Sequence, residues 1–473
     1  MMYRVMIDDV DATADVVEMS WRLGVRRADD RVGTGRGRII LDNEGGQYAP
    51  EGDGGLALAQ GAPVTIEVDD GGSWRRMFTG EVAYIEPQAG GYGRRMATLS
   101  IAGTEARLLH TLVRPGLLLD VDSHEAIEAV LSHPDLAGLS RDIGEGAARF
   151  ASFGEQWGGG AAALRVIQAV AQAEGGRFSA DREGVLVYRG RDDVLAGGLP
   201  DATLDGLGED AAYIYGGDVV NRVRVGVRPR RVGNPNTVLW TLSGAQRIRP
   251  NRVLTLIVRL RDGQGRSVGA AYIESPVSGA DFTANTQPDG AGVDKTSDVS
   301  VTVISIEGGS VTLAIENVGE NAVYLMSGAR LRGTPVIGGD MAWVERSDNA
   351  SAAAYGPRTL NLPLPLLDSL EAGEARADFE LAGRSDPRGA LTRLTLSERA
   401  GFGHALARSL FDRVRVIDPH TGHDGVYILI GEFHKVTLGG ARHQTVWTLE
   451  RIPLTEYWTV GVAPLGVTTL LAG

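Results

Sequence analysis

The feature that most constrains this fold is a β-hairpin pattern that occurs near both ends of the chain. Residues 427–451 read YILIGEFHKVTLGGARHQTVWTLER, in which two runs rich in β-branched and aromatic side chains flank a Gly-Gly pair. Such runs favour a pleated, half-buried surface, and the glycines favour a turn between them. Residues 77–103, MFTGEVAYIEPQAGGYGRRMATLSIAG, have the same organisation. The two hairpins together predict two similar small β-barrels, one at each end of the chain.

The two hairpins also share short motifs. The triplet GEV at 80–82 corresponds to GEF at 431–433, and basic pairs at 94–95 and 442–443 open the second strands. This match is short and contains gaps, so two unrelated hairpins with similar turns remain the alternative.

Length and composition limit the class of protein. A chain of 473 residues is long enough for several domains, and 65 glycines with 43% hydrophobic residues indicate a turn-rich, largely β protein with packed cores. The absence of cysteine excludes disulfides, zinc-thiolate sites and thiol catalysis. A net charge of −13 argues against a protein that holds nucleic acid through phosphate contacts.

The sequence contains no recognisable targeting segment. The N-terminus, MMYRVMIDDVDATAD, lacks the apolar region of a signal peptide. The longest apolar runs, such as 253–258, are far shorter than the ~20 residues of a membrane span. We therefore expect synthesis and folding in the cytoplasm, with no stable membrane insertion.

The order of strand and helix patterns predicts a fold that is mainly β with α+β parts. The predicted domains are an N-terminal β-barrel (1–112), an α+β domain of helices plus a β-hairpin (113–212), a second α+β/β domain (213–235 and 346–400), an inserted β-sandwich (236–345), the closing part of a second β-barrel (401–456) and an apolar C-terminal docking tail (457–473). An insertion into a loop is expected to be tolerated because closing a longer loop costs little additional entropy.

Helical spacing of apolar residues is confined to a few stretches. Ser123 is a plausible N-cap for a helix that continues to Leu131, and a second helix is predicted at 162–173, ended by a Gly-Gly pair and followed by a hairpin. Further helices are predicted at 370–382 and 403–410.

Three stretches carry a family resemblance. They are ALRVIQAVAQAEGGRFSADREGVLVYRGRDD at 163–193, the closing strands at 408–451, and EYWTVGVAPLGVTTLL at the end of the chain. These stretches resemble the hub proteins of phage tail tips and contractile-injection baseplates. The segment SVTLAIENVGENAVYLMSGARLRGTPV within 236–345 is similar to β-sandwich inserts in tail proteins of GC-rich phages.

The resemblance implies a structural homotrimer at the virion tail tip, assembled in the cytoplasm of a bacterial host. Two similar barrels per chain would place six in a ring, which matches a hexameric tail tube or distal tail protein above to a threefold spike, fibre or tape-measure protein below. DNA would pass only in transit, through a lumen that we expect to be acidic and hence to repel phosphates. No catalytic, cofactor-binding or metal-binding residue is predicted.

Several motifs with possible chemistry have a simpler structural interpretation. The stretch 418–424, DPHTGHD, has metal-ligand residue types, but Asp, Pro and Gly favour a turn. The glycine-rich segment 33–37 lacks the Lys-Ser/Thr of a phosphate-binding loop and is interpreted as a flexible hairpin tip. The stretch 289–294 lacks the closing Glu of a calcium loop. His434 and His443 are expected to form a structural pair across the final hairpin.

Two other functions remain as alternatives to the hub. One is a tail-associated enzyme that degrades the cell envelope, although no catalytic motif stands out among the residues. The other is a module that binds host surface glycan through 236–345, which an exposed Trp240 or Trp343 would favour.

Overall fold

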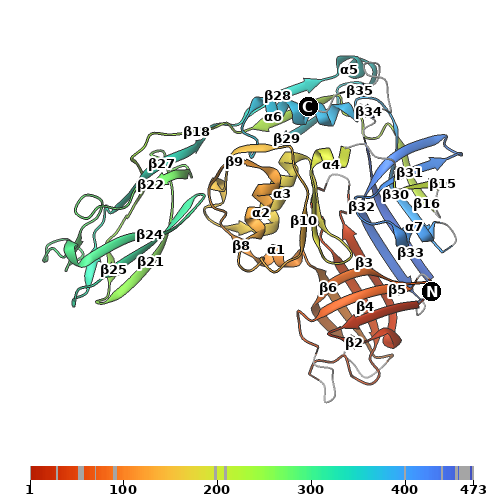
Figure 1. Ribbon diagram of the computed structural model, residues 1–473, viewed down its shortest axis with the longest axis horizontal. Helices are drawn as coiled ribbons and strands as arrows, with labels where there is room; N and C mark the ends of the chain where they lie inside the picture. Colours follow the sequence, from red (N-terminus) through yellow and green to blue (C-terminus); the bar gives the residue numbers. More distant parts are fainter. Residues whose placement is uncertain are drawn as a thin grey trace.

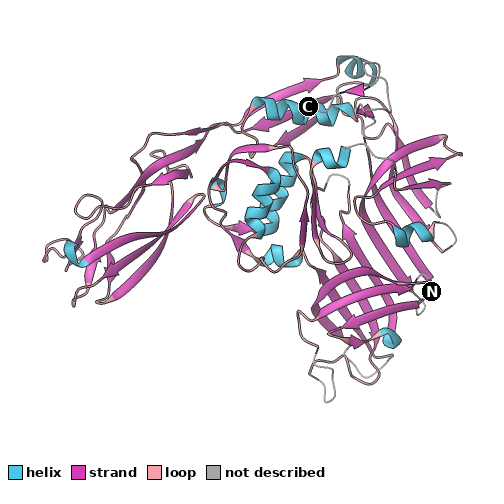
Figure 2. Cartoon of the chain, in the orientation of Figure 1, coloured by secondary structure: helices cyan, strands magenta, loops and turns pink. Residues whose placement is uncertain are grey.

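The structure is a computed structural model in which strands greatly outnumber helices (Figure 2). It describes residues 2–27, 30–51, 58–69, 71–88, 93–195, 200–206, 210–398, 401–437, 440, 442–452, 456–457 and 469–470. The predicted class, mainly β with α+β parts, is confirmed. None of the helices in these ranges combines the length and hydrophobicity that a bilayer crossing requires.

The largest sheet has 13 strands and joins the two ends of the chain (Figure 1). Its main path runs β16-β30-β33-β32-β3-β4-β7-β6-β5-β1-β2, and β31 pairs with β32 and with β15. The N-terminal half contains β1 (Met2–Ile7), β2 (Val10–Asp11), β3 (Val16–Gly24), β4 (Arg36–Asp42), β5 (Pro63–Asp69), β6 (Trp74–Pro87) and β7 (Met96–Gly103). The C-terminal half contains β15 (Ala202–Asp205), β16 (Asp210–Tyr215), β30 (Gly389–Ser397), β31 (Arg413–Asp418), β32 (His423–Thr437) and β33 (Arg442–Arg451).

The prediction of two closed β-barrels was wrong. Among the described strands, β1 pairs only with β2 and β5, and β16 pairs only with β30, so neither half closes on itself. Instead β3 pairs with β32 of the other half, from Met19 opposite Val436 to Gly24 opposite Gly431. An unpaired edge strand must be covered, and here each half covers an edge of the other. The two halves consequently share one hydrophobic core, to which Trp21 and Trp447 both belong.

The correspondence between the two hairpins is also less close than the sequence suggested. Both have a long first strand, β6 and β32, and each pairs with its partner strand through an irregularity in register. However, Glu81 points outward and forms an ion pair with the half-exposed Arg107, whereas Glu432 is buried. Because successive residues of a strand face opposite sides, the two motifs have opposite orientation.

An α+β unit follows β7. It contains α1 (Ala106–His110), β8 (Leu112–Val113), β9 (Leu118–Asp122), α2 (Ser123–Leu131), β10 (Arg141–Ile143), β11 (Arg149–Phe153), β12 (Ala161–Ala162), α3 (Ala163–Glu174), β13 (Arg177–Ala180), β14 (Leu186–Arg189) and α4 (Arg191–Leu195). The predicted helices and the hairpin of β13 and β14 are present. Asp122 rather than Ser123 occupies the N-cap of α2, and its backbone N–H donates to Glu125 Oε2 over 3.0 Å.

A three-stranded sheet under a helix packs against this α+β unit. Its order is β28 (Ala342–Ser347), β17 (Arg222–Val227) and β29 (Thr359–Pro363). The predicted helix at 370–382 is α6 (Leu370–Ala382), which is capped by Ser369 and covers β17 and β28. A short helix, α5 (Asn349–Tyr355), precedes β29. Valines of β17 and helix α3 belong to the same hydrophobic cluster, so the two units form one packed body.

The insert leaves this sheet and forms an elongated arm (Figure 1). Its strands are β18 (Arg230–Val232), β19 (Thr237–Thr241), β20 (Gln246–Ile248), β21 (Arg252–Arg259), β22 (Gly269–Ile273), β23 (Ala284–Asn285), β24 (Val299–Glu307), β25 (Ser310–Asn317), β26 (Val323–Leu325) and β27 (Arg330–Gly338). They form three small sheets around two hydrophobic clusters. The β24–β25 turn returns to the α+β unit, where the N–H of Gly308 donates to the Pro115 carbonyl over 2.8 Å.

A short helix near the end of the chain, α7 (Phe402–Ala407), corresponds to the one predicted at 403–410. Most of the predicted docking tail, 457–473, lies outside the described residues. Two short strands of this region, β34 (Glu456–Tyr457) and β35 (Thr469–Leu470), pair in parallel.

Candidate functional site

The candidate functional site is the seam where β3 pairs with β32. Two glycines allow the backbones to meet there: Gly24 has a φ of 72°, and a Cβ on Gly431 would lie 2.1 Å from the Val25 carbonyl oxygen. Glycine is therefore required at this crossing, because any side chain would push the strands apart. The seam has an inner face, turned toward the core, and an outer face.

A buried ion pair ties three parts of the chain together on the inner face. Arg182, on the turn between β13 and β14, donates to both carboxylate oxygens of Glu432, with Nε–Oε1 at 2.9 Å and Nη2–Oε2 at 2.6 Å. Its remaining N–H groups reach the carbonyls of Ala405 and Leu406 in α7, at 2.9 and 2.8 Å. The α+β unit is thereby fixed to the seam by charge-assisted bonds.

The carboxylate of Glu432 is ionised although it is buried. Burial alone would raise its pKa, but the charge of Arg182 and the bonds from it outweigh burial and lower the pKa from 4.5 to about 2. The pair satisfies the condition for burying a charge, which is that a partner of opposite sign accompanies it.

Two histidines and two aromatic residues complete the inner face. His434 Nδ1 lies 2.9 Å from His443 Nε2, and the hydroxyl of Tyr3 lies 3.1 Å from His443 Nδ1. The indole of Trp21 stacks on His434 with ring centroids 4.8 Å apart. Burial lowers the pKa of both histidines, that of His443 to about 2, so both are neutral at pH 7. The predicted structural pair is confirmed as a contact, and its members are sealed from solvent.

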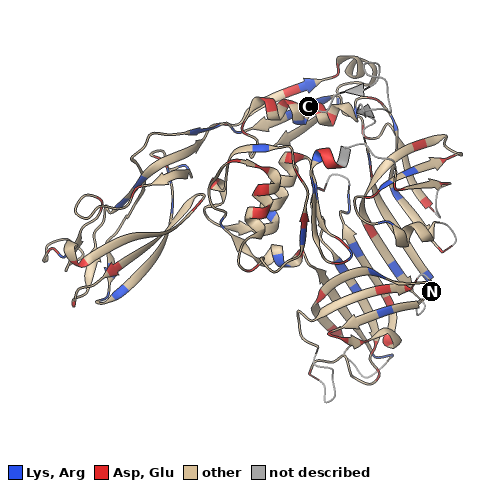
Figure 3. Ribbon diagram, viewed as in Figure 1, with Lys and Arg blue, Asp and Glu red and all other residues tan. Residues whose placement is uncertain are grey.

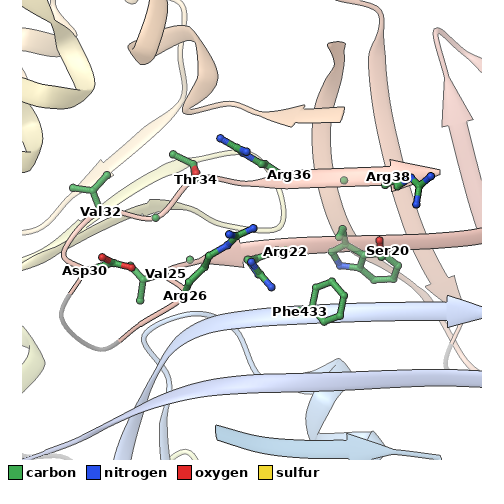
Figure 4. A pocket seen from close by; sticks show the side chains of 14 residues that line it. Ser20, Arg22, Val25, Arg26, Asp30, Val32, Thr34, Arg36, Arg38 and Phe433 are labelled. Carbon is green, nitrogen blue, oxygen red and sulfur yellow. The ribbon is translucent and has the colours of Figure 1, made fainter. Parts of the chain in front are cut away.

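The outer face of the same strands has a different character. Four arginines, Arg22, Arg26, Arg36 and Arg38, line a hollow of about 390 Å³ above β3 and β4 (Figure 4). We call these four residues the arginine face. Arg22 lies opposite Arg36 in the strand pairing, and its guanidinium lies 5.1 Å from the ring of Phe433 on β32.

The carboxylate of Asp30 lines the same hollow but is not paired with the arginine face. In the described ranges, no acidic side chain forms an ion pair with any of its four members. Partial burial, followed by the charge of Arg26, lowers the pKa of Arg22. Sequence reasoning missed this site. The signal that could have found it is the alternation of arginine with apolar or glycine positions at 21–23 and 36–39.

A second buried network lies behind the seam. Arg177 of β13 binds Glu450 of β33 through Nε–Oε2 at 3.0 Å, and Arg376 binds Glu380 within α6 at 2.7 Å. Arg31, from the β3–β4 connection, lies 3.5 Å from Glu380 and 3.6 Å from Glu450. These contacts hold the connection, α6 and the C-terminal half together beside a hollow of about 530 Å³.

The interpretation of 33–37 as a flexible tip was wrong. The segment does connect β3 to β4, but the N–H of Gly33 donates to the Phe178 carbonyl over 2.9 Å, and the N–H of Phe178 donates to the Arg31 carbonyl over 3.0 Å. The buried carboxylate of Glu105 accepts from Gly35 at 3.2 Å. The glycines here allow close backbone approach, since a Cβ on Gly33 would lie 2.4 Å from Gly24.

The other motifs are local structure. Asp418 accepts from the N–H and the hydroxyl of Thr421 and so closes a turn, as predicted. Asp289 accepts from the N–H of Ala291 within its own loop. The described residues contain no group of three or more side chains arranged to hold a metal ion. Trp240 is half-buried. Trp343 is exposed, with 44% of its surface accessible, but it belongs to β28 rather than to the insert arm, and the guanidinium of Arg224 lies 5.3 Å from its ring.

No family model matches the chain. No curated protein matches it by sequence either. In structure it is similar to the tail protein from Neisseria meningitidis MC58, with a TM-score of 0.50, 11% identity, and coverage of 95% of this chain and 97% of that one.

Two further similar structures are tail proteins of prophages. The 43 kDa tail protein of prophage MuSo2 from Shewanella oneidensis has a TM-score of 0.49 and 14% identity, covering 95% of this chain and 98% of that one. Prophage tail protein gp18 from Listeria monocytogenes EGD-e has a TM-score of 0.46 and 8% identity, covering 94% of both chains. The likeness to the Neisseria protein gives the chain the fold of a tail protein over nearly its whole length, in agreement with the resemblance found in the sequence.

Proposed function

We propose that this chain is a structural protein of the tail tip or baseplate hub of a phage or phage-like particle. The observation that supports it is the fold shared with a tail protein over 97% of that protein's length. The three stretches that resemble tail hubs in sequence support it independently, since they were identified without the fold.

In this proposal three copies form a ring. Each copy contributes two strand-rich halves of one sheet, β1–β7 and the set β15, β16 and β30–β33, so a threefold ring presents six halves to a hexameric tube. The ring joins the tail tube or distal tail protein to a central spike, fibre or tape-measure protein, and DNA crosses it only in transit. The expected acidic lumen stays a prediction, which a reconstructed ring with a basic bore would contradict.

We propose no enzymatic activity for the chain. The acid and base groups that meet on the inner face of the seam, Glu432, His434 and His443, are buried and bonded to one another and to Arg182. A general acid or base must reach a substrate proton, and groups sealed inside a core do not. Release of fragments from peptidoglycan or capsule by the purified chain would overturn this part of the proposal.

The mass of the assembled chain tests the ring. We expect light scattering across a concentration series to give three times the mass of one chain at high concentration. A different closed number of copies would contradict the symmetry match, whereas the tail-protein fold would stand.

A further inference from the structure

Within the described residues, the arginine face forms no ion pair with a carboxylate, whereas pairs of arginines elsewhere in the chain do. On three other surfaces, two neighbouring arginines share one carboxylate. The shared residues are Glu67 between Arg4 and Arg76, Glu345 between Arg222 and Arg224, and Asp281 between Arg330 and Arg332. Arg22 and Arg36 are direct cross-strand neighbours, yet no carboxylate in the described ranges forms an ion pair with either of them, including Asp30, which lines the same hollow.

This arrangement is unfavourable in the isolated chain. Like charges directly opposite each other on neighbouring strands repel, and Arg22 is also partly removed from water. A surface of this kind is stabilised when a carboxylate from outside enters between the guanidinium groups, because arginine binds carboxylates through two parallel hydrogen bonds. The hollow above β3 and β4 provides the space for such a group (Figure 4).

We propose that the arginine face receives an acidic turn from a second copy of this chain. The turn is Asp8-Asp9, which joins β1 to β2 at the far edge of the N-terminal half of the sheet. Both aspartates are exposed, and neither forms an ion pair in the described structure. Both also have a left-handed backbone, with φ of 50° and 64°, so the two-residue turn is tight and projects its side chains from the sheet edge.

The charge balance favours a second copy over nucleic acid as the occupant. The chain carries a net charge of −13, so a duplex approaches it against a repulsive field, whereas another copy brings many carboxylates. Figure 3 shows acidic and basic residues interspersed over all parts of the fold. Because the donor turn and the acceptor face are separate parts of the chain, the contact is head-to-tail, and repetition of such a contact forms a ring when the rotation between copies closes.

This inference rests on the proposed homo-oligomer, and the variants are chosen to test it separately. The first pair is Arg36→Gln with Arg38→Gln, and the second is Asp8→Asn with Asp9→Asn, since asparagine tolerates a left-handed backbone. The control is Arg247→Gln with Arg249→Gln, which removes the same charge from exposed positions on the insert arm. Circular dichroism and thermal unfolding establish that each variant is folded.

Self-association is measured by sedimentation at low and high salt. We expect either test pair to raise the dissociation constant about tenfold at low salt, and less at high salt, where surface charges are screened. Combining the two pairs should add little further loss, because both remove the same contact. The control pair should associate as the wild type does.

Each other outcome overturns the inference in a recognisable way. If only the arginine pair weakens association, another segment occupies the face. If neither pair does so while the wild type still associates, the ring forms elsewhere and the proposed function survives. If the wild type is monomeric at every concentration, the homo-oligomer fails and the docking contact fails with it. Binding of a labelled 30-base-pair duplex that is lost in the arginine pair would make the occupant a phosphate backbone.

Discussion

The two faces of the β3–β32 seam differ in whether their charged side chains are paired within the chain. On the inner face Arg182 and Glu432 are almost fully buried and bind each other, and His434 is neutral. On the outer face Arg22 and Arg36 oppose each other without a carboxylate. A buried charge without a partner costs several kcal/mol, so the inner face must be satisfied within the chain. Charges in contact with water can remain unpaired until another molecule arrives.

The largest effect is expected from Glu432→Ala. The substitution leaves Arg182 buried without a counter-charge, and the free energy of unfolding should fall by about 3–5 kcal/mol. Chemical denaturation followed by circular dichroism measures the change.

The control is Glu81→Ala, because Glu81 is the residue that the sequence motif matches to Glu432. Its partner Arg107 is half-exposed, with 52% of the side chain accessible, so the expected loss is no more than about 1 kcal/mol. Equal losses from the two substitutions would mean that the orientation of the motif does not matter, and the contrast between the two faces would fail.

An effect that is smaller for each pH unit is expected from acid. The folded-state pKa values of His434 and His443 lie below the ordinary 6.5, so the unfolded chain takes up protons first as the pH falls. Stability should therefore be fully present above about pH 6.5 and decline below it, and His443 contributes a slope of at most about 1.4 kcal/mol per pH unit. Glu432, with its pKa lowered from 4.5 to about 2, adds a second decline below about pH 4.5.

Urea titrations between pH 8 and pH 4 measure this decline. The variant His443→Gln removes one of the two histidines, and the slope between pH 6.5 and pH 4.5 should become shallower. A free energy of unfolding that is constant from pH 7 to pH 4 would show that the inner face is not sealed.

The sequence was sufficient to predict a helix or hairpin wherever the pattern of residues that specifies it lies within the element. Helix α3, the hairpin of β13 and β14, and helix α6 were predicted within about one residue, because periodicity and capping residues lie within the element itself. The β3–β32 pairing joins Met19 to Val436, and no local pattern specifies which edge strand a distant strand will cover. The barrels were predicted to close because each half was considered without the other.

The arginine face was missed for the same reason. Arg22 alternates with the buried Trp21 and Leu23, which predicts that Arg22 faces outward. Nothing in the sequence states that it will lie opposite Arg36, since this depends on the register of the β3–β4 pairing.

The smallest effect, and the sharpest test of the contrast, is expected from Arg36→Gln with Arg38→Gln on the stability of the monomer. Because the variant relieves repulsion between Arg22 and Arg36, the free energy of unfolding should stay within about 0.5 kcal/mol of the wild type or rise slightly. Any gain should shrink in high salt, where the repulsion is screened. The measurement is made by denaturation at concentrations at which the chain is monomeric. A loss of about 2 kcal/mol or more in the free energy of unfolding would mean that these arginines stabilise the fold, as Arg182 does. Their charges would then be paired within the chain and would not bind a partner.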